Sequence, residues 1–169
     1  SGWLGHVRAD YEVHTGWTAG LDYLATSGTD AAGVLGERKS FASPAPSSAY
    51  LLTIATSDSA DTAAGSTRTN AANHIGRLDL AQGLRLAVVS VEGALGESVN
   101  ALVRYGQIKT AKKNTTTDSD DYGSEVDLKI QFKSSKYTSW ILEGAVFDPG
   151  SFFANKDNAK LVSLAYRLD

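Results

Sequence analysis

The stretch that decides the fold is GSEVDLKIQFKSSKYTSWILEGAVFDPG, residues 123–150. In its first half every second residue from Val126 to Phe132 is apolar, and the residues between them are charged or polar. A period of two excludes an amphipathic helix and predicts a strand with one apolar and one charged face. After the polar turn 134–136 the alternation resumes at Trp140 and stops at Pro149 and Gly150. The stretch therefore predicts a β-hairpin with strands of about ten residues, which is the length that crosses a bilayer when tilted.

The same alternation recurs along the chain and predicts seven strands. We expect them at about 3–14, 17–27, 84–95, 98–107, 124–133, 138–147 and 160–168. A long loop over 28–82, a second polar loop over 107–122 and a third over 148–158 alternate with short turns, and the chain ends on the short-turn side. Short turns on one side and long loops on the other are typical of outer-membrane barrels, with the short turns in the periplasm. The predicted fold class is therefore all-β, an antiparallel transmembrane β-barrel.

The aromatic residues favour the membrane interpretation over a soluble one. Trp17, Phe132, Tyr137, Trp140 and Tyr166 fall near the short-turn rim, and Trp3, Tyr23 and Tyr105 fall near the long-loop rim. Two aromatic girdles are expected where a barrel meets the membrane interfaces. The predicted lipid-facing girdle residues are Trp3, Tyr11, Trp17, Tyr23, Tyr105, Phe132, Trp140 and Tyr166. The alternatives are a soluble β-barrel or sandwich that binds a ligand, and a structural barrel that presents its loops.

Composition narrows the function classes. The chain has 169 residues and a net charge of −3, so it lacks the basic stripe expected of a nucleic-acid partner. It has no cysteine, which excludes disulfides, thiolate metal sites and thiol catalysis. There is no G-x-S-x-G nucleophile motif either. We therefore expect no enzyme activity, no catalytic residue and no cofactor.

Two motifs carry a resemblance to a known family. DYGSEVDLKIQF followed by ILEGAVFDPGSFF, and LDYLATSGTDA near the start, resemble strands of the alginate export family of outer-membrane β-barrel porins. The resemblance implies a monomeric barrel of about eighteen strands, of which residues 1–169 would be the C-terminal portion. It implies a channel in the outer membrane of a Gram-negative bacterium that passes an anionic, alginate-like polysaccharide or small anions. Its partners would be outer-membrane lipid, lipopolysaccharide and the remaining N-terminal strands, in the same or a second chain.

The charged residues of the strands are the candidate functional residues, because rings of charge set the selectivity of a pore. The predicted lumen residues are His6, Arg8, Asp10, Glu12, Asp22, Arg104, Glu125, Asp127, Lys129, Glu143 and Arg167. His6 and His14 lie too far apart for a metal site, so solvated side chains are the favoured interpretation. The acidic loop 117–121 resembles a calcium loop, but it lacks the glycine spacing of an EF-hand, and a solvated loop is favoured.

The hairpins also allow predictions of register. Placing Lys133 opposite Ser139 puts Lys129 opposite Glu143, and a three-residue loop from His14 to Gly16 puts Arg8 opposite Asp22. We expect an ion pair at both places. The outward-facing apolar residues should be exposed in the isolated protein; these are Val7, Ala9, Tyr11, Leu21, Val103, Leu128, Ile130, Leu142 and Leu164.

Overall fold

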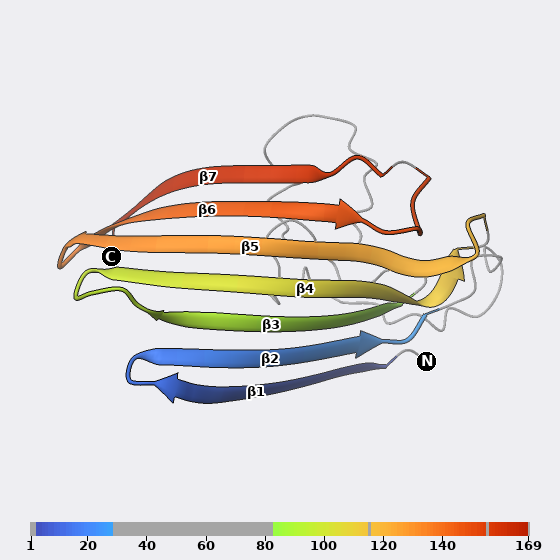
Figure 1. Cartoon of the computed structure of the whole chain (residues 1–169), viewed down its shortest axis with the longest axis horizontal. Coiled ribbons are helices and arrows are strands. Elements are labelled where there is room, and N and C mark those ends of the chain that lie inside the picture. The colour runs from blue at the N-terminus through green and yellow to red at the C-terminus, as the bar shows by residue number, and fades with distance from the viewer. Residues whose placement is uncertain (1–2, 29–82, 115, 155, 169) are drawn as a thin grey trace.

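A computed structural model describes residues 3–28, 83–114, 116–154 and 156–168. These residues form seven strands, all antiparallel to their neighbours (Figure 1). The strands are β1 (Leu4–His14), β2 (Trp17–Thr26), β3 (Leu84–Ala94), β4 (Val99–Asn114), β5 (Ser119–Ser135), β6 (Thr138–Pro149) and β7 (Ala159–Leu168). All seven predicted strands are therefore confirmed. The predicted loop 28–82 lies, apart from Gly28, outside the described residues.

The strands form one sheet in the order of the sequence, from β1 to β7. The connections after β1, β3 and β5 lie at one end of the sheet, here called the short-turn end, and those after β2, β4 and β6 lie at the other, the long-loop end, where only the β4–β5 connection is short, with four residues (Figure 1). Because each of the six pairings is antiparallel, β1 and β7 run in the same direction and form the two edges of the sheet. The fold is thus an all-β antiparallel meander. Within the described ranges, no helix is long and apolar enough to cross a membrane.

The predicted loop over 107–122 is wrong, because most of it belongs to the two longest strands. β4 continues to Asn114 and β5 already begins at Ser119. Ladder hydrogen bonds form between backbone groups and need no apolar side chains, so a polar hairpin can extend beyond the apolar part of the sheet. The register shifts between Ile108 and Lys109, where Tyr122 is the extra residue of a β-bulge.

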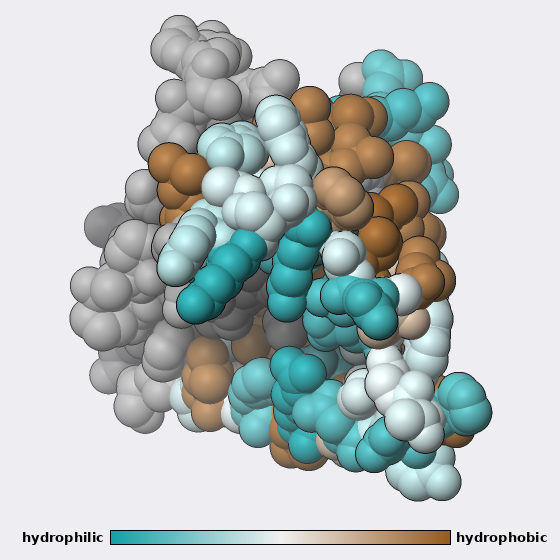
Figure 2. Space-filling model, turned by 90° about the vertical axis from the view of Figure 1, so that its left-hand side faces the viewer, coloured by the Kyte–Doolittle hydropathy of each residue, from teal (hydrophilic) through white to brown (hydrophobic). Residues whose placement is uncertain are grey.

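One face of the sheet, here called the outer face, is apolar and exposed. Val7, Tyr11 and Leu164 expose 68%, 72% and 68% of their surface, and Leu128 and Leu142 each expose 44%. Of the nine residues predicted to be exposed, only Ile130 is intermediate. Seen from the short-turn end, hydrophobic residues gather on the right, the side that faces the viewer in Figure 1 (Figure 2). No second sheet of the described residues packs on this face.

The opposite face, here called the inner face, carries a buried apolar cluster near the long-loop end. Its members are Leu24, Leu84, Leu86, Val88, Ile108, Tyr122 and Phe147, with Phe152 and Phe153 packed against them. β3 is consequently apolar on both faces over part of its length. The expectation of an inner face that is polar throughout is wrong there. Toward the long-loop end the inner side chains become apolar, and the outer ones become polar.

Candidate functional site: the charged inner face

The strand register places all eleven predicted lumen residues on the inner face. Residues that pair across two strands lie on the same face, as Arg8 and Asp22 do, and Arg104 and Asp127. Side chains also alternate between faces along each strand, so the pairings from β1 to β7 assign every one of these residues to one face. Their exposure differs along the face. The carboxylates Asp22, Glu125 and Asp127 are buried, at 4%, 1% and 1% exposed, and the charged residues of β1 are exposed.

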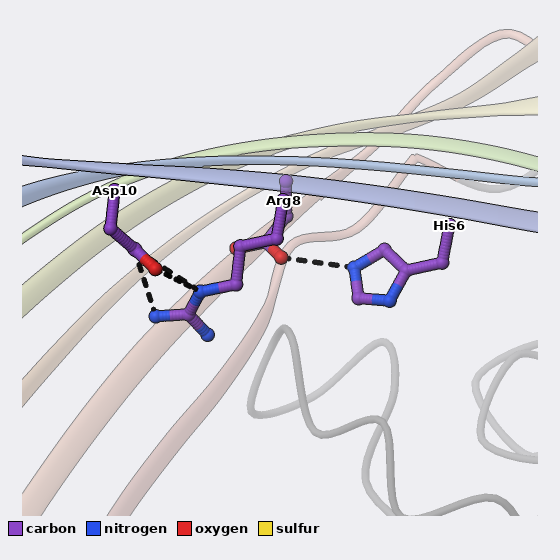
Figure 3. A network of polar contacts seen from close by, with 4 residues as sticks. His6, Arg8 and Asp10 are labelled. Carbon is purple, nitrogen blue, oxygen red and sulfur yellow. Dashed lines mark hydrogen bonds and ion pairs between the residues drawn. The ribbon is translucent and has the colours of Figure 1, made fainter.

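The edge strand β1 presents His6, Arg8 and Asp10 from the same side (Figure 3). Arg8 binds Asp10 with two nitrogens, Nε at 2.8 Å from Oδ2 and Nη2 at 3.0 Å from Oδ1. Asp22 instead lies 3.0 Å from Nε2 of His6. The predicted Arg8–Asp22 ion pair is therefore wrong, although the two residues do face each other across the ladder. Residues two apart on one strand share a face, and the long Arg8 side chain reaches along β1 to the exposed Asp10.

The register of this first hairpin is confirmed, but its turn is shorter than predicted. Leu4 pairs with Thr26 and Glu12 with Thr18, after which the register shifts and His14 pairs with Trp17. The turn is reduced to Thr15 and Gly16, and Gly16 has a φ of 78°, which a residue with a Cβ rarely adopts.

The second predicted pair is confirmed. Lys129 faces Glu143 across β5 and β6, and its Nζ lies 3.2 Å from Oε1. The two side chains are 37% and 29% exposed, so the pair contributes only a few tenths to about 1 kcal/mol. A further pair joins β4 to β5, where Arg104 Nε lies 3.3 Å from Asp127 Oδ2. Both of its side chains are largely buried, at 17% and 2% exposed, where a charge needs an opposite charge or hydrogen bonds close by.

The inner face between the short turns and the Tyr122 bulge carries more carboxylates than cations. The carboxylates there are Asp10, Glu12, Asp22, Glu92, Glu125, Asp127 and Glu143. The arginines and lysines there are Arg8, Arg104, Lys129, Lys133 and Arg167. Arg8, Arg104 and Lys129 each lie beside a carboxylate. This part of the inner face is thus negative on balance, with its central cations paired.

The predicted girdle residues lie on the outer face. Phe132, Trp140 and Tyr166 are adjacent in the register near the short turns, and the Trp140 and Tyr166 ring centroids are 4.8 Å apart. Trp17 belongs to the same rim, where its ring covers Gly93. Tyr23 and Tyr105 lie nearer the long-loop end, as does Trp3 just before β1, and Tyr11 lies between the two rims.

The aromatic residues of the inner face were missed by the sequence analysis. Tyr122 is 1% exposed, and its ring contacts those of Phe147, Phe152 and Phe153 at centroid distances of 6.2, 5.3 and 4.6 Å. The segment after β6 is held there by a bond from the Phe152 amide to the Asp121 carbonyl, 2.8 Å long. The phenylalanine pair after Pro149 was a signal that this segment packs against the sheet.

The acidic stretch 117–121 is divided between a turn and β5. Asp118 lies in the turn and its Oδ1 is 3.2 Å from Lys113 Nζ, whereas Asp120 and Asp121 belong to β5. In the described parts of the chain, no three His, Cys, Asp or Glu residues are grouped so that they could hold a metal ion. A solvated acidic turn remains the interpretation of this stretch.

No protein-family model matches the chain, and no curated protein matches it.

Proposed function

We propose that the chain forms part of the wall of an outer-membrane channel. The observation that carries the proposal is the two-sided sheet, whose outer face is apolar and exposed from β1 to β7 and whose inner face holds the charges. A transmembrane barrel needs this distribution, with apolar residues toward lipid and polar residues toward the lumen. The two aromatic rims support the same function, and so do the connections after β1, β3 and β5, which are all two to four residues long and lie at one end of the sheet.

The exposed apolar area argues against the soluble alternative. The outer face exposes Val89, Val103, Leu128 and Leu142, on four consecutive strands, at 44% to 51%. Soluble monomers rarely expose a contiguous apolar patch of more than a few hundred Å². A soluble sheet of this kind would need a second layer, and the described residues provide none on this face.

A channel also requires that the sheet be closed by further strands. The edges β1 and β7 run in the same direction, so antiparallel closure takes an odd number of additional strands. A second copy of this sheet in the same membrane orientation would meet both edges in parallel and would not satisfy that requirement. We therefore propose that different strands, in the same protein or in a second chain, close the barrel, since open edges are not tolerated in hydrocarbon.

The proposed solute is an anionic polysaccharide of the alginate type or a smaller anion. This part of the proposal rests on the resemblance to the alginate export family. In the described part, the cations in the middle of the inner face are paired and carboxylates are in excess, so most cationic sites for an anion would have to come from the closing strands, and Lys133 near the short turns would add one from this sheet.

The test is conductance of the protein, purified from membranes with the strands that close its barrel, in planar bilayers. We expect detergent-dependent solubility, stepwise channel insertion and a reversal potential in a KCl gradient that indicates anion preference. A cation preference would refute the proposed anionic solute but not the channel function. Stable insertion without conductance would favour the structural barrel, and a monodisperse protein without detergent would refute the membrane function.

A further inference from the structure

A pocket of about 380 Å³ lies at the long-loop end of β4, β5 and β6. Tyr105, Gln107, Ser124 and Asp148 line it from the strands, and Lys156 and the segment around Gly150 line it from the loop after β6. Gln107 pairs with Ser124, and Ser124 pairs with Asp148, so these three residues form one row across the outer face. The pocket therefore opens on the outside of the wall.

The pocket lies where the outer face changes from apolar to polar. The neighbouring row toward the short turns contains Tyr105, Val126 and Val146, which are 47%, 51% and 41% exposed. The next row toward the long-loop end consists of Gln107, Ser124 and Asp148, and all three are polar. In a barrel, such a boundary is the level at which lipid headgroups meet the wall.

The polar side chains of the pocket are available to a ligand. Among the described residues, no side-chain hydrogen bond or ion pair engages Gln107, Asp148 or Lys156. An amide, carboxylates and an ammonium group together supply both acceptors and donors. Asp121 is a second carboxylate in the lining, so one lysine faces two acids and the pocket is unsuited to a phosphate. Sugar hydroxyls, which both donate and accept, match this set, and Tyr105 offers an aromatic surface beneath them.

We propose that this pocket binds the sugar headgroup of a membrane glycolipid. The inference rests on the proposed function, because the outer face must meet lipid. The headgroup would occupy the polar pocket, and the acyl chains would continue over Val126 and Val146. A soluble sugar offers the same hydroxyls but no chains for the apolar row, so the position of the pocket favours the lipid.

The test is native mass spectrometry of the purified barrel in phosphocholine micelles, titrated with glucosyl diacylglycerol. We expect a saturable one-to-one adduct that phosphatidylglycerol with the same chains does not form. Gln107→Ala should weaken binding about threefold to tenfold, because one hydrogen-bonding group is lost. Ser124→Phe should abolish it by filling the pocket. Gln131→Ala, which removes the same amide from the inner face, is the matched control and should bind as the wild type does.

The outcomes separate the proposals. Equal binding by wild type and both pocket variants would overturn the glycolipid site. Equal competition by free glucose would assign the pocket to soluble sugar, and preferential binding of phosphatidylglycerol would assign it to phosphate; either result would overturn it. Conductance of the same preparations is measured in parallel. Conductance without an adduct would refute the glycolipid site alone, whereas failure to insert into bilayers would refute the proposed channel function.

Discussion

Replacing Leu128 with arginine tests whether the outer face meets lipid. Leu128 is near the middle of the apolar row of β5, between Val103 on β4 and Gly144 on β6. It is already 44% exposed, so in a soluble protein an arginine there would keep its charge in water and would cost less than about 1 kcal/mol. At the midplane of a bilayer the same substitution costs about 2–4 kcal/mol. The two environments therefore predict clearly different losses of stability.

The assay is reversible unfolding by guanidinium of the purified protein in lipid vesicles. The matched control is Leu161→Arg, which makes the same substitution at a similarly exposed position, 37%, on the inner face. We expect Leu128→Arg to lower the free energy of unfolding by at least about 2 kcal/mol and Leu161→Arg by less than about 1 kcal/mol. Equal losses for the two variants would refute the assignment of lipid to the outer face.

Two further predictions concern the charged inner face and the bulge. Asp10→Asn removes the carboxylate that binds Arg8 through two nitrogens, so the reversal potential in a KCl gradient should shift toward anions, and by more than in Asp22→Asn. A larger shift from Asp22→Asn would contradict the observed pairing. Gly123→Ala should lower the free energy of unfolding by more than about 1 kcal/mol, because Gly123 has a φ of 138° and a Cβ there would overlap the Asp148 carbonyl. Gly96→Ala, at a turn glycine with open space around it, is the control, and equal stability of the two variants would exclude strain at the bulge.

The sequence by itself determined the number of strands and, over their apolar parts, which side chains share a face. A period of two between Val126 and Phe132 fixes which side chains share a face, and the short turns fix the register within one or two residues. The pairing of Lys129 with Glu143 followed from those two facts alone. The exposure of Leu128 followed as well, because the alternation places it on the apolar face and the predicted register is the one observed.

Only the tertiary structure decided which side chains bind one another and where the polar hairpin ends. Arg8 binds Asp10 and not Asp22. A flexible side chain on an edge strand has several carboxylates within reach, and the alternation does not indicate which of them it binds. The extension of β4 to Asn114 depends on backbone hydrogen bonds that carry no hydrophobic signal. The burial of Tyr122 depends on a bulge and on the segment after β6, which meet only when the sheet is assembled, because contacts between distant segments leave no period in the sequence.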